Sequence, residues 1–228
     1  MTKPIYSITP FTLLDYPDKL ACILWFAGCN MRCKYCYNID IVKGKGRYSY
    51  DDILPFIDAR KNLLDGVVLS GGECTLHADI IPFIVEIKKR NMLVKIDTNG
   101  SKPKVLEKLL NDKLVDYVAL DFKALDRNFY SVTQSDLFGK FEKSLNILNS
   151  GLIPFEVRTT VHSTLLNTEE LHKMVLYLAS KDYKGIYYLQ HFFNDCETLG
   201  ETGNDYFRLN VEDFKSDQVR VVIRNAQS

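Results

Sequence analysis

The sequence has no excess of charge of either sign, no long hydrophobic run and no apolar leader segment. Its 29 Lys and Arg residues balance 29 Asp and Glu residues, so the formal net charge is zero. A balanced charge gives no electrostatic signature of nucleic-acid or membrane-surface binding. The longest apolar run, residues 21–27, is far too short to span a bilayer, and no secretory signal core follows residues 1–4. We therefore expect a cytoplasmic protein with neither nucleic acid nor membrane as partner.

Cysteine is also scarce, and the arrangement of three cysteines lacks a fourth ligand. Cys29, Cys33 and Cys36 are separated by three and two residues, and neither cysteine nor histidine occurs again before Cys74. A closed structural zinc site needs four protein ligands, which are usually two close pairs. Three thiolates alone favour a [4Fe–4S] cluster with one iron open to an exogenous ligand. A zinc site completed by a distant histidine is the alternative.

Short apolar runs rich in β-branched residues recur along the chain and predict strands. They are near-continuous, as expected for parallel strands that are buried on both faces. The six runs are residues 20–26, 66–69, 93–96, 115–120, 155–161 and 185–189, and residues 219–223 are a weaker seventh candidate.

Segments with helical spacing of apolar residues lie between the predicted strands. Residues 167–178 begin with an Asn and a Glu three residues apart, which predicts a capped helix start. Gly151 follows a second such segment, residues 138–148, and Ser101 with Pro103 opens a third. Alternating strands and helices without a change in composition predict one α/β domain over residues 1–228.

Two closures of this sheet fit the pattern equally well: a flat doubly wound sheet and a partial barrel. Eight strand–helix units close a complete barrel, so six units would leave one side open. We expect a partial (βα)6 TIM-like barrel of parallel strands that is laterally open. The open side would admit a loop of another protein.

Polar and ionisable residues gather where the predicted strands end. Parallel α/β folds place their functional sites at these carboxyl ends. In chain order, the residues are Gly28 and Cys29, residues 71–73, residues 97–100, Asp121 with Lys123, Arg158 within the fifth predicted strand, and His191 at the end of the sixth. Six such groups of polar residues at one edge of the sheet predict an active site there.

Two of these segments resemble motifs of radical S-adenosylmethionine enzymes. Residues 29–36, with the aromatic Tyr35 before the third cysteine, resemble the cluster loop of that superfamily. Residues 70–73, Ser-Gly-Gly-Glu, resemble the stretch that holds the methionine amino group of S-adenosylmethionine. The resemblance implies a [4Fe–4S] cluster and S-adenosylmethionine as cofactors, with Cys29, Cys33 and Cys36 as the cluster ligands.

A closer resemblance is to the activases of glycyl radical enzymes. Residues 12–17, Thr-Leu-Leu-Asp-Tyr-Pro, together with residues 28–30 resemble the activating protein of anaerobic ribonucleoside-triphosphate reductase. Residues 120–123 resemble the aspartate-x-lysine element of the same activases. The similarity extends from about Ile5 to His191 and weakens toward the C-terminus.

The resemblance also implies roles for the polar residues at the strand ends. Glu73 is expected to accept from the substrate ammonium, Tyr35 to contact adenine, and Lys123 and Arg158 to bind a carboxylate. Asp97 and Asp121 are expected to hold the ribose, the ammonium or a small cation. The complete set of expected cofactor-binding residues is Tyr35, Tyr37, Gly71, Gly72, Glu73, Asp97, Thr98, Asp121, Lys123, Arg158 and His191.

The implied activity is cleavage of S-adenosylmethionine to methionine and a 5′-deoxyadenosyl radical, which takes a hydrogen from a glycine of a partner enzyme. The expected partners are anaerobic ribonucleoside-triphosphate reductase and a flavodoxin or ferredoxin-type reductant. Two alternatives stay open. One is a radical enzyme acting on a small molecule, similar to the deazapurine carboxylate synthases, and the other is an electron-transfer or zinc-binding module.

Overall fold

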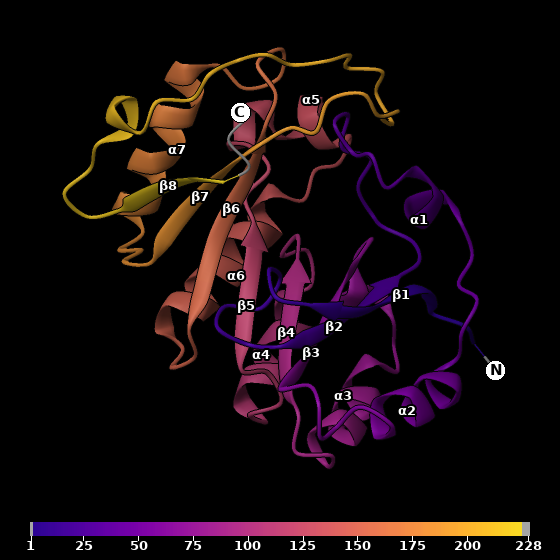
Figure 1. Cartoon of the computed structure of the whole chain (residues 1–228). Helices are drawn as coiled ribbons and strands as arrows, with labels where there is room; N and C mark the ends of the chain where they lie inside the picture. The colour runs from indigo at the N-terminus through magenta and orange to yellow at the C-terminus, as the bar shows by residue number, and fades with distance from the viewer. Residues whose placement is uncertain (1, 225–228) are drawn as a thin grey trace.

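The computed structural model describes residues 2–224 and contains one sheet of eight strands (Figure 1). The strands lie side by side in chain order: β1 (Ile5–Thr12), β2 (Ala21–Phe26), β3 (Gly66–Gly71), β4 (Leu93–Thr98), β5 (Tyr117–Asp121), β6 (Phe155–Val161), β7 (Ile186–His191) and β8 (Arg220–Arg224). Strands β2 to β8 are parallel, and β1 pairs antiparallel with β2. Strands β1 and β8 form the two edges, so the sheet does not close.

Sequential strand order decides between the two closures. A doubly wound sheet reverses its strand order at a switch point, whereas this order runs from β1 to β8 without reversal. The doubly wound alternative is therefore wrong, and the laterally open partial barrel is confirmed. The helices are α1 (Ile39–Lys43), α2 (Tyr50–Asp58), α3 (Ile80–Lys88), α4 (Pro103–Asn111), α5 (Asp126–Thr133), α6 (Phe138–Ser150) and α7 (Thr168–Ser180).

The two faces of the sheet differ in character. One face packs against α2 to α7 and forms a large apolar core, to which β2 contributes Cys22, Leu24 and Phe26. The alternate residues of the same strand, such as Ile23, belong to a small second cluster on the other face. Beyond that cluster the second face carries charged side chains, including buried Lys95. The expectation of near-continuous apolar strands is therefore wrong for β4 and β6, where Lys95, Glu156 and Arg158 line the cavity.

The six main predicted strands correspond to β2 through β7, and the weaker seventh candidate is β8. Strand β1 was not predicted. Its sequence contains Pro10, which cannot donate to a ladder and is tolerated only at an edge or an irregularity. The pairing of β1 with β2 is indeed irregular between Thr9 and Thr12.

Three helix predictions agree with the structure. Asn167 caps α7, where its side chain accepts from the backbone N–H of Glu170 and the Glu170 side chain accepts in return. Gly151 follows α6, and Pro103 is the first residue of α4. No helix within residues 2–224 is long and apolar enough to cross a membrane. The assignment of residues 1–228 to one domain stays a prediction.

We expect the substitution Asn167→Ala to lower the free energy of unfolding by about 1 kcal/mol, because it removes the side-chain acceptor of a capping box. Asp79→Ala is the matched control, since Asp79 precedes α3 without a side-chain cap hydrogen bond. Urea unfolding of both variants measures the difference. Equal losses in the two variants would contradict the role of the cap.

Candidate active site

A cavity of about 590 Å³ opens at the carboxyl ends of the parallel strands. Most of the residues that the sequence predicts for the site line it: Cys29, Cys33, Cys36, Tyr35, Tyr37, Gly71, Gly72, Asp97, Asp121, Lys123 and Arg158. These residues come from β3 to β6 and from the loop after β2, so residues expected at separate strand ends lie around one cavity. Three expected site residues, Glu73, Thr98 and His191, are outside the lining.

The three thiols belong to the cysteine loop, residues 28–38, which joins β2 to α1. Backbone hydrogen bonds connect this loop to α5: the N–H of Arg32 donates to Thr133 O (2.8 Å), and the N–H of Lys34 donates to Val132 O (2.9 Å). Cys33 is buried, and Cys29 and Cys36 are half-buried at the cavity wall. The loop therefore presents all three sulfur atoms to one space.

Thiolates are the ligands that iron–sulfur clusters use. Among the described residues, no His, Cys, Asp or Glu side chains form a group of three that could hold one metal ion. Thiolates that each bind a different iron of a cluster need not converge on one point. The cavity lining contains no histidine and no further cysteine within residues 2–224. The donor set suits a cluster with three protein ligands.

Burial favours the protonated form of these thiols. It raises the pKa of Cys29 to about 11 and that of Cys33 to about 12. The positive charge of Lys123 opposes this rise in pKa at both thiols. Since iron binds thiolate, assembly of a cluster must release these protons.

Two glycines at the end of β3 bring that strand end against β2 and the cysteine loop. Gly71 has a φ of +114°, and a Cβ there would lie 2.4 Å from Phe26 N. A Cβ on Gly72 would lie 1.9 Å from Gly28 O. A side chain would push β3 away from β2 at position 71 and away from the loop at position 72, so the motif has a structural reason within the protein itself.

Glu73 is fully buried, and its carboxylate is already surrounded by donors. It accepts from Thr98 Oγ1 (2.8 Å) and from the backbone N–H groups of Asn99 (2.7 Å) and Thr75 (3.2 Å). Burial raises the pKa of Glu73, and these hydrogen bonds oppose the rise. The carboxylate thereby joins the ends of β3 and β4. Its expected contact with the substrate ammonium stays a prediction.

Asn99 extends this connection to the cysteine loop. Its side-chain amide donates to Asn30 Oδ1 (3.0 Å) and lies 3.9 Å from Cys29 Sγ. The backbone N–H of Met31 is 3.5 Å from the same sulfur. Hydrogen bonds to ligand sulfur tune the potential of an iron–sulfur cluster, so these two donors are suited to that role.

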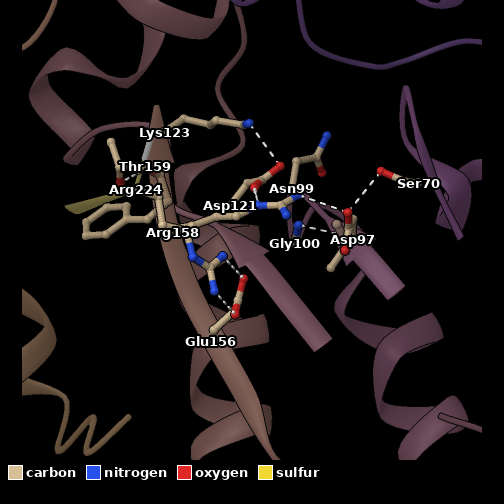
Figure 2. A network of polar contacts seen from close by, with 12 residues as sticks. Ser70, Asp97, Asn99, Gly100, Asp121, Lys123, Glu156, Arg158, Thr159 and Arg224 are labelled. Carbon is tan, nitrogen blue, oxygen red and sulfur yellow. Dashed lines mark hydrogen bonds and ion pairs between the residues drawn. The ribbon is translucent and has the colours of Figure 1, made fainter. Parts of the chain in front are cut away.

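A charged network crosses the ends of β4, β5 and β6, as Figure 2 shows. Arg158 lies between two carboxylates: its Nη2 is 3.2 Å from Asp97 Oδ2, and its Nε donates to Asp121 Oδ1 at 2.6 Å. Lys123 donates to the other oxygen of Asp121 (3.0 Å), and Lys95 pairs with Asp97. With three cations and two carboxylates, this network of five carries one excess positive charge.

The network determines the protonation of its own members. Burial raises the pKa of Asp121, but Arg158 and Lys123 outweigh it and lower the pKa from 3.8 to about 2. The pKa of Asp97 is lowered in the same way, with Arg158 and Lys95 overcoming burial. Burial lowers the pKa of Lys123 and Arg158, but the Asp121 carboxylate raises it well above the usual range. All four groups are charged at neutral pH.

Sequence reasoning missed a second charged pair in the cavity wall. Arg224 of β8 binds the two oxygens of buried Glu156 at 2.8 and 3.0 Å, and its guanidinium stacks on Tyr188. Trp25, Lys95 and Gln190 also line the cavity and were not predicted. Residue spacing contained the signal: Glu156 lies two positions before Arg158, so both side chains face the same side of β6.

The remaining expected residues have distinct environments. Tyr35 is buried, and its hydroxyl has no hydrogen-bond partner among the described residues, as would suit a group that contacts a ligand. Tyr37 lies edge-on to Phe193, with ring centroids 5.9 Å apart. Thr98 is turned toward Glu73. His191 is half-buried at the end of β7, and burial lowers its pKa.

Comparison with known proteins identifies the family. The sequence profile of the Radical SAM superfamily matches residues 23–178, more than half of the chain. The chain belongs to the radical S-adenosylmethionine superfamily. The matched range includes the cysteine loop and the strand ends from β2 to β6. That superfamily implies a [4Fe–4S] cluster and S-adenosylmethionine, which the donor set above fits.

The similar proteins include activating enzymes. A Methanocaldococcus jannaschii protein provisionally named a glycyl-radical enzyme activating enzyme is 30% identical over 199 residues, covering 84% of this chain and 81% of its own. The pyruvate formate-lyase-activating enzyme of Clostridium pasteurianum is 28% identical over 173 residues, covering 73% of this chain and 71% of its own.

A solved structure shares the fold. Streptococcus suis SuiB bound to S-adenosylmethionine superposes with a TM-score of 0.63 at 15% identity, over 89% of this chain. The present chain spans about half the length of that protein (52%).

The substitution Cys33→Ala should abolish iron retention after anaerobic reconstitution, because two thiolates cannot hold the cluster. Cys196→Ala is the control, since Cys196 is exposed and outside the cavity lining. Iron and sulfide analysis of both variants decides the matter. Full iron content in Cys33→Ala would contradict the ligand assignment.

The pH dependence of stability tests the charged network. Because the pKa of Asp121 falls from 3.8 to about 2 on folding, the unfolded state binds more protons between these values. The stabilising contribution is complete above about pH 4 and is lost as the pH falls toward 2. The difference in free energy of unfolding between wild type and Asp121→Asn should therefore shrink as the pH is lowered from 6 to 3.

The control for this measurement is Asp58→Asn, which alters an exposed pair with Arg90. Exposed pairs contribute little to stability, so this variant should differ little from wild type at any pH. A difference between wild type and Asp121→Asn that stays constant across the pH range would refute the assignment.

Proposed function

We propose that this protein is a radical S-adenosylmethionine activase that installs a glycyl radical on anaerobic ribonucleoside-triphosphate reductase. When bound, the cluster held by Cys29, Cys33 and Cys36 would supply an electron to cleave S-adenosylmethionine and generate the 5′-deoxyadenosyl radical. The observation that carries the proposal is the shared cavity, in which the three thiols face the charged network at the strand ends.

The charged network would orient S-adenosylmethionine. Its excess positive charge suits the methionine carboxylate, and Lys123 and Arg158 are two of the cations that line the cavity. Arg158 is held from both sides by Asp97 and Asp121, so it is oriented before any ligand arrives. Tyr35, with a hydroxyl that lacks a partner among residues 2–224, would contact the adenosine part.

The mouth of the cavity supports a protein as the substrate. Leu14 and Phe193, which are 92% and 54% exposed, line the cavity at its rim, as does half-exposed Tyr37. Exposed apolar side chains around an opening mark an interaction site. Leu14 belongs to residues 12–17, the segment that resembles ribonucleotide reductase activating proteins, and this segment connects β1 to β2 at the rim.

The other parts of the proposal follow from the chemistry. A flavodoxin or ferredoxin-type protein would supply the electron, and the cytoplasm would provide the reducing conditions that free thiols need. A substrate pocket that the C-terminal segment seals would favour the small-molecule alternative. The exposure of Leu14 in the cavity wall argues against such a seal.

The test is anaerobic incubation of the reconstituted, reduced protein with S-adenosylmethionine and candidate partners. We expect a glycyl radical signal by electron paramagnetic resonance on anaerobic ribonucleoside-triphosphate reductase. A reductase variant with Ala in place of the radical glycine is the matched control and should give no signal.

Two outcomes would contradict the proposal in different ways. A glycyl radical on pyruvate formate-lyase alone would keep the activase function and replace the partner. Formation of 5′-deoxyadenosine with no radical on either enzyme would favour the small-molecule alternative.

A further inference from the structure

The segment that follows β7 has no regular structure and crosses the carboxyl edge of the sheet. We call residues 192–205 the strap. Figure 1 shows the strap passing over the top of the molecule, next to the loop between β2 and α1. The strap lies outside the sequence motifs and contributes only Phe193 to the cavity lining.

The strap pairs with the cysteine loop through the backbone. The N–H of Leu199 donates to the carbonyl of the cluster ligand Cys36 (3.0 Å), and the N–H of Gly200 donates to Lys34 O (2.9 Å). The contact between Phe193 and Tyr37 is a third link between the two segments. The cysteine loop is therefore held on one side by α5 and on the other by the strap.

The close approach at this point requires glycine. A Cβ built on Gly200 would lie 2.5 Å from Lys34 Cβ and 2.7 Å from Lys34 Cα. Separations below 3 Å between such atoms force a displacement, and the Cα of Lys34 belongs to the backbone of the cysteine loop. A side chain at position 200 would thus push the strap away from the residues that flank Cys33 and Cys36.

The far end of the strap is fixed to the loop after β6. Asp205 accepts from the N–H (2.7 Å) and the hydroxyl (2.8 Å) of Ser163. Buried His162 lies with Nε2 3.2 Å from Gly203 O, and its Nδ1 faces the N–H of Thr164. The Thr164 hydroxyl lies 2.9 Å from the same Nδ1, so both ring nitrogens of His162 have partners. The strap is therefore hydrogen-bonded to the loop after β6 at one end and to the cysteine loop near its middle.

We propose that the strap positions the cluster ligands and that Gly200 is a positioning residue, because it lets the strap pair with the cysteine loop beside Cys36. The inference rests on the cluster part of the proposed function and is independent of the partner enzyme. Losing a contact that orients a metal ligand costs about 10–100-fold in metal affinity or activity.

The experiment compares Gly200→Ala with Gly139→Ala in the reconstituted full-length protein. Gly139 is in α6, and a Cβ there meets nothing within 4 Å. We expect Gly200→Ala to lose iron to a chelator about tenfold faster than wild type, at the lower end of that range, and to show an altered electron paramagnetic resonance spectrum of the reduced cluster. Gly139→Ala should match wild type in both.

Thermal unfolding of the cluster-free proteins separates positioning from general damage. A midpoint near that of wild type for Gly200→Ala, together with faster iron loss, supports the proposal. If Gly200→Ala loses iron at the same rate as wild type and gives the same spectrum, the proposal is overturned.

Amide hydrogen exchange in cluster-free wild type tests the pairing without any substitution. We expect slow exchange at Leu199 and Gly200, since both N–H groups are donors to the cysteine loop. Exchange at the rate of an unprotected peptide would overturn the proposal even if Gly200→Ala fails to fold. If wild type binds no iron but these amides are protected, the cluster assignment fails and the pairing stands.

Discussion

The guanidinium of Arg158 binds the carboxylates of Asp97 and Asp121 across three neighbouring strands. The rest of the site depends on this interaction, because the helices cover only the other face of the sheet. The inner face must stay open to ligands, and the charged groups there are stable only when they are paired. Arg158 pairs with both carboxylates, and each carboxylate pairs with one lysine as well: Asp97 with Lys95 and Asp121 with Lys123. A pre-oriented cationic surface is the result.

The cysteine loop is stabilised by a different principle. It has no regular structure of its own, and its position comes from contacts with elements that are distant in sequence. Gly72 lets β3 approach it from one side, the carbonyls of α5 accept from it on another, and Gly200 pairs with it on a third. Backbone contacts of this kind hold the three cysteines at the wall of one cavity.

The sequence predicted the parallel strands and the strand-end site well, since apolar runs and motif spacing are local signals. It failed where the signal depends on a neighbour. Strand β1 contains Pro10 and exists by pairing with β2, and the strap has no periodicity to detect. Motif identity also did not show that the Glu73 carboxylate accepts from Thr98 of β4 and from Asn99 just after it, because those donors are distant in sequence. The two-residue spacing of Glu156 and Arg158 did indicate that both side chains face the cavity.

The most direct test of the account is cleavage of S-adenosylmethionine by the purified protein. The protein would be reconstituted anaerobically with iron and sulfide, reduced, and mixed with S-adenosylmethionine, and 5′-deoxyadenosine would be measured by chromatography. The account predicts that 5′-deoxyadenosine forms only when both the cluster and the reductant are present. A protein that assembles the cluster but forms no 5′-deoxyadenosine, or one that binds zinc and no iron, would contradict it.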